Sequence, residues 1–246
     1  AVRRSGLQPS DVQECLMGNV LSAGLGQNPA RQAAVGAGLP VEIGSTTVNK
    51  VCGSGMKTVM MAANAIKAGE YEVIVAGGME NMNSAPYLLR QARFGYRLND
   101  NKIVDHMVHD GLWDIFNDMH MGITAEIVAE RFNVTREQAD LMAYQSHMKA
   151  QAAQSEGRFD QEIVPVVIKD RKGDTTFDKD EGIRPDTTIE VLSKLPASFR
   201  KDGMVTAGNS SQLSDGASAL VVCSRSFAEA RGIKPLAEIL GYSTGG

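Results

Sequence analysis

One cysteine, Cys52, stands where an extended run gives way to a helical one, in Val48-Asn49-Lys50-Val51-Cys52-Gly53-Ser54-Gly55. The amino terminus of a helix presents unpaired N–H groups and a partial positive charge, and both stabilise a thiolate. The thiolate is the nucleophilic form of cysteine, and helix starts lower the pKa of a thiol. The following glycines let a ligand approach the backbone closely. This position predicts a nucleophile, against the alternative of a small buried hydrophobe, the common role of a free cysteine.

The other two cysteines, Cys15 and Cys223, lie within apolar strand-like segments and are interpreted as packing residues. The three are far apart, with no Cys-x-x-Cys pair and no histidine at ligand spacing. This usage argues against a metal site and a disulfide scaffold, and it suits a reducing, cytoplasmic location. No permanently bound cofactor is expected.

A cysteine nucleophile usually works with a base, most often histidine, and the chain has four. His147 is predicted on the polar, solvent-facing side of a helix. His106 and His109 flank Met107-Val108 in an Asp-containing segment that suggests a surface helix. His120, in Asp118-Met119-His120-Met121-Gly122, opens a helix, where it either hydrogen-bonds a ligand or only caps the loop. None of the four is assigned as the base.

Composition excludes several classes of function. The chain has 246 residues, a net charge of -4 and only 5% aromatic residues, with no basic stretch that would follow a phosphate backbone. Nucleic acid is therefore not an expected partner. No apolar stretch is long enough to cross a bilayer, so no membrane is expected either. The length allows one large domain or two smaller ones.

The first third of the sequence alternates strand and helix signals. Strands are predicted at 15–18, at 45–51 and, as a run buried on both faces, at 71–76. A helix is predicted from Asn28-Pro29 to about residue 39, and another from Cys52 to Gly69. This alternation predicts a parallel sheet covered by helices.

From residue 83 to about 202 the sequence is more polar and less regular, which suggests an α+β excursion inserted into the α/β core. Its predicted elements are a helix at 122–132, a helix with the capping box Thr135/Gln138, a hairpin from 163 around Lys172-Gly173-Asp174, and a capped helix at 187–195. The run of small residues at 206–211 is a candidate loop for close approach to a ligand. A buried strand then returns at 217–223.

Taken together, several segments resemble the thiolase family, in that family's order and over nearly the whole chain. They are Gly26-Gln27-Asn28-Pro29-Ala30-Arg31-Gln32, the Cys52 segment, Val75-Ala76-Gly77-Gly78-Met79-Glu80-Asn81-Met82, Asp110-Gly111-Leu112-Trp113-Asp114, His120-Met121-Gly122 and Thr206-Ala207-Gly208-Asn209-Ser210-Ser211. The Cys-Gly-Ser-Gly and His-Met-Gly versions are similar to short-chain, acetoacetyl-CoA thiolases.

The resemblance implies an α/β thiolase-like fold: a β-α-β-α-β core with an inserted α+β loop domain that binds CoA. The implied divisions are a core at 1–82 without its first strand, the inserted domain at 83–203, a return to the core at 204–235, and the strand-like start of a C-terminal domain at 236–246. The C-terminal half of the family fold is expected to be absent, so the chain resembles an N-terminal part.

The resemblance also implies a function, that of an acetyl-CoA C-acetyltransferase that uses coenzyme A as substrate and product. Cys52 would be the acylated nucleophile, and Arg184 would lie near the adenine end of CoA. The positions that match the pantetheine path are Leu112, His120, Met121, Ala207, Gly208 and Ser211. The implied assembly is a homodimer or homotetramer, and no metal is implied.

Two other readings remain open. A broad-range 3-ketoacyl-CoA thiolase would differ only in the length of its pocket. The chain alone would otherwise be a non-catalytic CoA-binding piece, because the family's Gly-His-Pro histidine, second catalytic cysteine and Asn-Glu-Ala-Phe segment do not occur in these 246 residues. Each missing acid/base group costs about 10²–10⁴-fold in rate, so we expect the chain alone to be inactive.

Overall fold

The computed structural model describes residues 1–245, which form two compact units; Gly246, the last residue of the predicted segment 236–246, lies outside them. Of the described residues, unit 1 comprises 1–112 and 213–245, and unit 2 comprises Trp113–Gln212. The predicted limits of an inserted domain at 83 and 203 stay a prediction.

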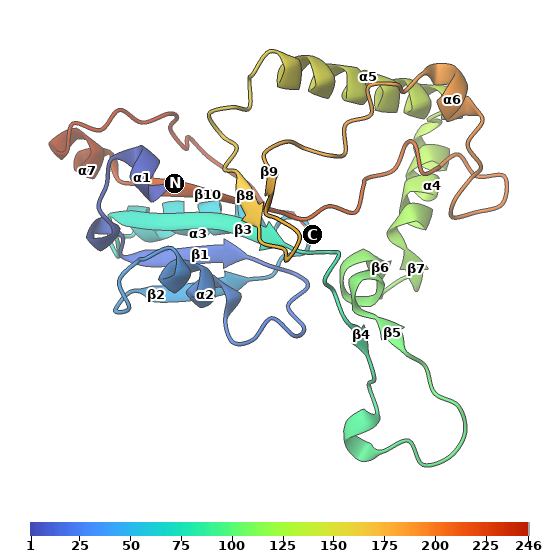
Figure 1. Cartoon of the computed structure of the whole chain (residues 1–246), viewed down its shortest axis with the longest axis horizontal. Coiled ribbons are helices and arrows are strands. Elements are labelled where there is room, and N and C mark those ends of the chain that lie inside the picture. Colours follow the sequence, from blue (N-terminus) through green and yellow to red (C-terminus); the bar gives the residue numbers. More distant parts are fainter. Residues whose placement is uncertain (246) are drawn as a thin grey trace. The chain divides into compact units, whose positions relative to one another are not determined.

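Unit 1 is built on a four-stranded sheet with the order β10-β3-β1-β2 (Figure 1). The strands are β1 (Glu14–Gly18), β2 (Gly44–Val48), β3 (Val73–Glu80) and β10 (Gly216–Cys223). β1 runs parallel to both β2 and β3, as predicted, but β10 runs antiparallel to β3. The parallel pairing predicted for the strands of the first third is therefore confirmed, and no direction had been predicted for β10. β10 is antiparallel because the chain returns to the sheet at the end where β3 finished, and Gly216 pairs with Glu80.

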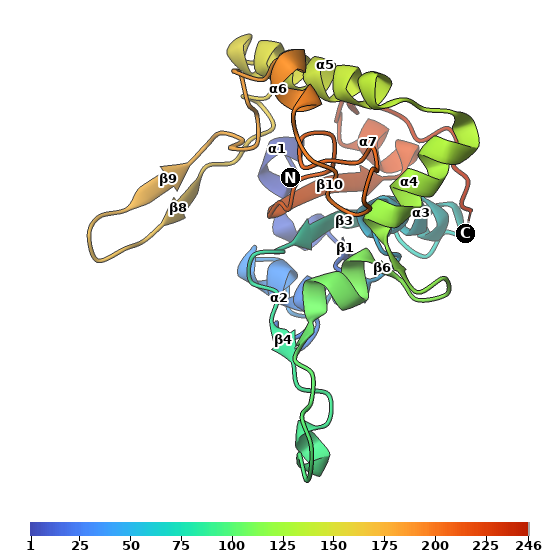
Figure 2. The same ribbon diagram turned by 90° about the vertical axis from the view of Figure 1, so that its right-hand side faces the viewer.

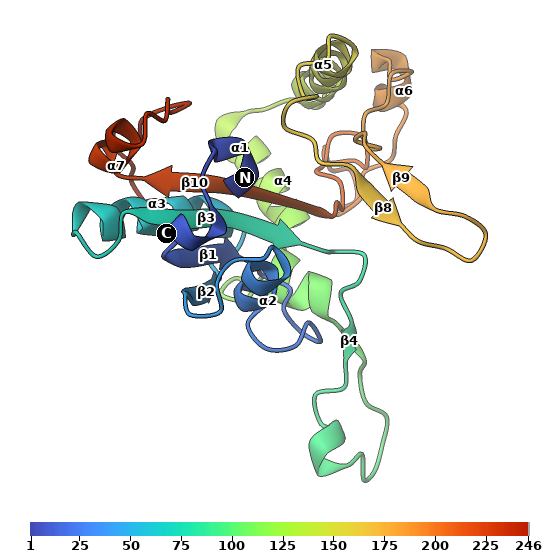
Figure 3. The ribbon, with the colours of Figure 1, turned by 60° about the vertical axis from the view of Figure 1, so that its left-hand side comes forward.

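Two helices cover opposite faces of this sheet (Figure 3). α2 (Pro29–Gly36) begins at Asn28, whose side chain accepts a hydrogen bond from the N–H of Arg31, so the predicted cap is confirmed. α3 (Ser54–Lys67) lies on the other face. Residues of β1 and β3 point alternately to the two faces, with Cys15, Met17, Val73 and Val75 toward α2 and Leu16, Ile74 and Ala76 toward α3.

The last strand differs from its prediction in burial. It was expected to be buried, but the first part of β10, from Gly216 to Leu220, is exposed. β10 is an edge strand that pairs only with β3 among the described residues, and the core reaches only its last residues, Val221 to Cys223. The strand-like run at 236–240 likewise forms no strand in the described chain, and Leu236 is fully exposed.

Short elements complete unit 1. An arm, residues 83–106, extends from the end of β3, and β4 and β5 pair antiparallel at its base (Figure 2). The remaining elements are α1 (Val2–Ser5), η1 (Pro9–Asp11), β4 (Tyr87–Leu88), η2 (Ala92–Phe94), β5 (Val104–Asp105), the π-helical η3 (Met107–Leu112) and α7 (Arg225–Ala230).

Unit 2 holds the elements predicted for the polar middle of the sequence, and Figure 2 shows its hairpin β8–β9 extending from the α5 end. The capping box of Thr135 and Gln138 is confirmed at the start of α5. The cap of α6 is Thr188 rather than the predicted Thr187, which is buried. The elements are β6 (Trp113–Asp114), β7 (Met119–His120), α4 (Met121–Phe132), α5 (Arg136–Ser155), β8 (Val166–Ile168), β9 (Thr175–Phe177) and α6 (Ile189–Ser193).

Candidate active site around Cys52

Cys52 lies in a tight turn between β2 and α3. The strand ends at Val48, earlier than predicted, and the helix begins at Ser54 with Gly53 as its N-cap. The thiol is exposed and has no hydrogen-bond partner among residues 1–245. The predicted position at a helix start is thus confirmed to within two residues, and the sulfur is open to a reactant.

The turn holds its shape through two side chains and a strained residue. The Ser54 hydroxyl accepts from the Lys50 N–H at 2.9 Å and donates to the Val51 carbonyl at 2.5 Å. The Asn49 side chain accepts from the Val51 N–H at 2.9 Å. Val51 itself has φ 47, which is a rare left-handed conformation for a β-branched residue. Such strain costs about 1–3 kcal/mol and is common at functional sites.

Glycines bring the start of α3 against the ends of two strands. A Cβ on Gly18, the last residue of β1, would lie 2.6 Å from backbone atoms of Ser54 and Gly55. One on Gly78 of β3 would lie 3.1 Å from the Cα of Gly55. The hydroxyl of buried Thr58 lies 2.9 Å from the carbonyl oxygen of Gly77, which ties helix to strand. Cys52 therefore sits at the carboxyl ends of the parallel strands, the usual ligand-binding edge of such sheets.

A cavity of about 480 Å³ opens beside Cys52 within unit 1. It is bounded by the ends of β1 and β3, the start of α3, η3 and the start of β10. Its lining residues are Gly18, Val20, Leu21, Val51, Cys52, Ser54, Gly55, Gly78, Met79, Glu80, Met82, Met107, Gly111, Leu112, Gly216, Ala217 and Ser218. Of the predicted CoA contacts, the structure places Leu112 in this cavity with Cys52. None of these lining residues is a histidine, so the described residues provide no histidine base there.

Glu80 shapes one side of the cavity and was missed as a functional residue in the sequence. Its carboxylate accepts hydrogen bonds from the N–H groups of Val20 and Leu21, both at 2.9 Å, and from the Asn19 side chain at 3.0 Å. Three donors on one carboxylate hold the loop after β1 against the end of β3. The available signal was its place in the Gly77–Met82 motif.

The other two thiols are unsuited to nucleophilic attack. Burial raises the pKa of Cys15 to about 11, and burial also raises the pKa of Cys223. Both are therefore protonated near neutral pH, in agreement with their interpretation as packing residues.

Two of the histidines differ from their sequence predictions. His106 was expected on a surface helix but is 4% exposed and bonds Asp110 and the backbone of Ala23. His147 was expected to face solvent, but its ring is half-buried and accepts a hydrogen bond from the Arg184 N–H at 3.2 Å. In both cases a partner distant in sequence satisfies the ring.

His120, in unit 2, caps α4. Its Nδ1 accepts a hydrogen bond from the Gly122 N–H at 3.0 Å, so the neutral ring carries its proton on Nε2. The ring also stacks on Phe199 with 4.8 Å between ring centroids. A Cβ on Gly122 would lie 2.3 Å from the Phe199 ring, which explains the glycine after Met121. Capping is thus confirmed, and Nε2 remains available to a ligand.

The small-residue loop at 206–211 is held by a buried polar network of unit 2. Asn209 accepts from the Thr206 N–H at 2.7 Å and donates to Asp140 at 2.9 Å. Asp140 is 2% exposed and pairs with Arg136 at 2.7 Å. A Cβ on Gly208 would meet Leu192 and Leu195 at 2.6 and 2.5 Å, so the loop packs closely on the α6 segment.

The remaining predicted CoA contacts are also in unit 2. Met121, Arg184, Ala207 and Ser211 are exposed, as a residue that meets a ligand must be before binding. Buried Glu126 holds the chain just before the loop, because it accepts from the N–H groups of Met204 and Val205 at 3.0 and 2.9 Å.

A family model described as "Thiolase, N-terminal domain" matches residues 1–226. The chain belongs to the thiolase family. An acetyl-CoA acetyltransferase of Cupriavidus necator is 53% identical over the whole chain, and one of Pseudomonas aeruginosa is 52% identical. The chain spans 63% of the length of each of these curated relatives.

Solved structures agree with this membership. The crystal structure of the Bacillus anthracis acetyl-CoA acetyltransferase matches 96% of this thiolase chain with a TM-score of 0.92 and 43% identity, and the chain covers 60% of it. The acetyl-CoA acetyltransferase from Syntrophomonas wolfei matches with a TM-score of 0.93, also at 43% identity. The predicted thiolase-like α/β fold is confirmed.

The described part of this thiolase chain contains neither a cluster of metal-binding side chains nor a helix that could span a membrane. No three or more His, Cys, Asp and Glu side chains among residues 1–245 gather so as to hold a metal ion. Over the same residues, every helix is too short or too polar to cross a bilayer.

Proposed function

We propose that the protein containing this chain is an acetyl-CoA C-acetyltransferase in which Cys52 carries the acyl group. The observation that carries the proposal is the exposed Cys52 thiol, held on a strained turn beside a cavity at the carboxyl ends of β1 and β3. The names of the relatives of Cupriavidus necator and Pseudomonas aeruginosa support the same activity.

In the proposed reaction the Cys52 thiolate attacks the 3-carbonyl carbon of acetoacetyl-CoA. The bond between C2 and C3 breaks, and the carbanion that leaves takes a proton and departs as acetyl-CoA. The thiol of free CoA then attacks the acetyl-Cys52 thioester, which gives a second acetyl-CoA and restores the cysteine. The reverse sequence is a Claisen condensation, and both directions are covalent catalysis with ping-pong kinetics.

Coenzyme A serves in this proposal as substrate and product, and no permanently bound cofactor takes part. Leu112, His120, Met121, Ala207, Gly208 and Ser211 are proposed to contact pantetheine, and Arg184 the adenine end. The Nε2–H of His120 and the close-packed backbone at Gly208 suit such contacts, because one donates a hydrogen bond and the other lets a ligand approach.

The test is to incubate the whole protein with acetoacetyl-CoA and to locate the acetyl group by peptide mass spectrometry. We expect it on Cys52, with loss of acylation in Cys52→Ser and retention in the matched control Cys223→Ser. An acetyl group on another residue would refute the proposal.

Two alternatives are decided by companion measurements. Equal kcat/KM values across a series of 3-ketoacyl chain lengths would favour a broad-range 3-ketoacyl-CoA thiolase. Thiolysis at full rate by the 246-residue chain alone would refute the proposal that this part is inactive and requires groups from outside it.

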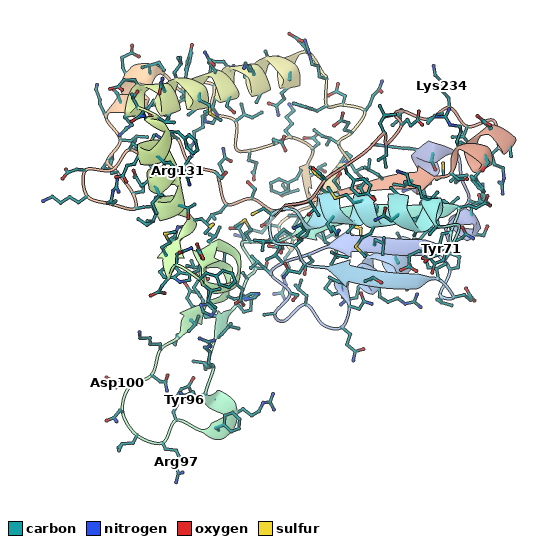
Figure 4. All side chains as sticks on the ribbon, turned by 180° about the vertical axis from the view of Figure 1, so that it is seen from behind. Tyr71, Tyr96, Arg97, Asp100, Arg131 and Lys234 are labelled. Atoms are coloured by element: carbon teal, nitrogen blue, oxygen red, sulfur yellow. The ribbon has the colours of Figure 1, made fainter. Side chains whose placement is uncertain are left out.

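We also propose a homodimer or homotetramer in the cytoplasm. The arm exposes large apolar side chains, with Phe94 83%, Leu98 85% and Ile103 65% exposed. Arg97 and Asp100 lie on the outer side of its end (Figure 4). An exposed apolar surface of this kind suits contact with a second copy. Light scattering that finds Phe94→Glu unchanged in oligomeric state would contradict a role for the arm. The cytoplasmic location is supported by three unpaired cysteines.

A further inference from the structure

His106 is a buried ring with two partners from different parts of unit 1. Its Nδ1 lies 2.5 Å from a carboxylate oxygen of Asp110, and its Nε2 accepts the backbone N–H of Ala23 at 3.3 Å. Because Nε2 acts as acceptor, the proton of the neutral ring is on Nδ1 and is donated to Asp110. The ring is 4% exposed, so water does not easily replace the bond between its Nε2 and Ala23.

The Ala23 side of this contact belongs to one wall of the Cys52 cavity. Val20 and Leu21, just before Ala23, line the cavity. Glu80 fixes the start of this loop through the N–H groups of Val20 and Leu21. His106 fixes its continuation, two residues later, at Ala23.

The Asp110 side belongs to a second, adjoining wall. Asp110 lies in η3, which contributes Met107, Gly111 and Leu112 to the cavity. The two walls meet closely, because a Cβ on Gly111 would lie 3.3 Å from the Leu21 side chain. η3 is a π-helical turn. This form is rare in proteins as a whole, and where it occurs it is often at a functional site.

We propose that His106 is a positioning residue that joins these two walls and thereby sets the size of the acyl group that the Cys52 cavity admits. The acyl part of the statement rests on the proposed function. His106 touches no reacting atom; it acts through the Ala23 loop and η3. Loss of the Ala23 bond frees one wall from the other, and the cavity then accepts larger groups.

Two substitutions separate the two bonds. His106→Gln loses the Asp110 bond but places an amide oxygen near the position of Nε2, so it still accepts from Ala23 and keeps that loop tied to residue 106, which directly precedes η3. His106→Asn places an amide nitrogen near the position of Nδ1 and can still donate to Asp110, but it leaves the Ala23 N–H unpaired. His109→Gln is the matched control, because His109 lies in the same turn, 4.0 Å from Asp110, and does not line the cavity.

The first measurement needs no catalytic activity. Cys52 is labelled with N-methylmaleimide and with N-phenylmaleimide, and the ratio of the two rates is compared between proteins. We expect His106→Asn to raise the relative rate of the bulky reagent about fivefold, the factor for one lost hydrogen bond of about 1 kcal/mol. We expect wild-type ratios for His106→Gln and His109→Gln. Amide hydrogen exchange at Ala23 should be faster in His106→Asn alone.

The second measurement uses the whole protein and compares kcat/KM for a short and a longer 3-ketoacyl-CoA. A shift toward the longer chain in His106→Asn, absent in His106→Gln, is the expected result. Wild-type labelling ratios and Ala23 exchange in folded His106→Asn would overturn the proposal. A changed labelling ratio with an unchanged chain-length profile would overturn its acyl part. Absence of acyl transfer in every protein, with the labelling ratio still changed, would refute the proposed function and leave the joined walls supported.

Discussion

Single residues with the same side chain behave differently because their surroundings differ. Cys52 is exposed, whereas Cys15 is 2% exposed and burial raises its pKa to about 11. At about pH 8 only about one Cys15 thiol in a thousand would be ionised. We therefore expect iodoacetamide to modify Cys52 in the native chain and to leave Cys15 intact, as measured by peptide mass mapping. Equal labelling of the two would contradict the structure.

The burial of Cys15 makes the stability of the folded chain depend on pH in the alkaline range. The pKa of Cys15 is raised from 9.0 to about 11 in the folded chain. The contribution of the protonated thiol to the free energy of unfolding is therefore fully present below about pH 9. It is lost as the pH rises to about 11, because the unfolded chain releases the proton first. Urea unfolding across this range should show a smaller fall in the free energy of unfolding for Cys15→Ala than for wild type. Parallel falls would contradict the shift.

Sequence reasoning placed Cys52 near a helix start because the signals for that position lie in its neighbours along the chain. It missed Glu80 and placed His106 on a surface, because both act through backbone N–H groups distant in sequence. Asn19 to Leu21 are about 60 residues from Glu80, and Ala23 is 83 residues from His106. The left-handed backbone of Val51 is also invisible in a sequence, because valine is an unfavourable choice for it.

Between elements, the close approach of α3 to β1 depends on Gly18. A Cβ there would lie 2.6 Å from backbone atoms at the start of α3, and backbone cannot give way as a flexible side chain can. We expect Gly18→Ala to destabilise unit 1 by about 1–3 kcal/mol and to displace the Cys52 turn. Urea unfolding and the rate of Cys52 alkylation measure the two effects.

The matched control for Gly18→Ala is Gly36→Ala at the end of α2, where an added Cβ meets nothing within 4 Å. That change should be neutral or stabilise by up to about 1 kcal/mol, since alanine favours helix. A Gly18→Ala chain as stable as the Gly36→Ala chain would rule out the close packing.

In unit 2 the loop at 206–211 depends on Asp140. Asp140→Asn leaves the Arg136 guanidinium without its counter-charge in a largely buried place, and such losses cost about 3–5 kcal/mol. We expect a loss near the lower end, because the amide still accepts a hydrogen bond. The measurement is urea unfolding followed by Trp113 fluorescence. Exposed Glu137→Gln on the same helix is the control and should cost less than about 1 kcal/mol.

Elements whose signals are local were predicted well. Asn28 with Pro29 and Thr135 with Gln138 identified two helix starts, because each cap acts within its own first turn. The direction of β10 was not predicted and its burial was predicted wrongly, because both depend on where the returning chain meets β3. The spacing of apolar residues along the sequence, every 3.6 residues in a helix and every second residue in a strand, does not show where the returning chain meets β3.

At the scale of the whole molecule, each of the two units has a reporter of its own. The only tryptophan, Trp113, is in unit 2, and buried Cys15 is in unit 1. We expect the urea transition followed by Trp113 fluorescence to differ from that followed by Cys15 thiol exposure. Gly18→Ala should move only the second, and Asp140→Asn mainly the first. Coincident transitions in all three proteins would instead indicate one cooperative unit.

The change in composition near residue 83 predicted an excursion from the core and a later return, and the thiolase motifs predicted the family. The limits of the inserted domain remain a prediction, because polarity changes gradually along the chain while compactness depends on contacts in space. The oligomeric state also remains a prediction. Apolar residues that are exposed and could form an interface cannot be told from buried ones in a sequence.

The antiparallel strand β10 has a consequence for synthesis on the ribosome. β3 pairs with it through Gly216 and Glu80, which are separated by well over a hundred residues. At about 5–20 residues per second, the edge of β3 waits about 7–27 seconds for its partner during translation. Through that time the nascent chain presents an unpaired strand end and a Cys52 cavity that lacks its wall from Gly216 to Ser218. Slowed translation across unit 2 would lengthen this exposure and increase the demand on chaperones.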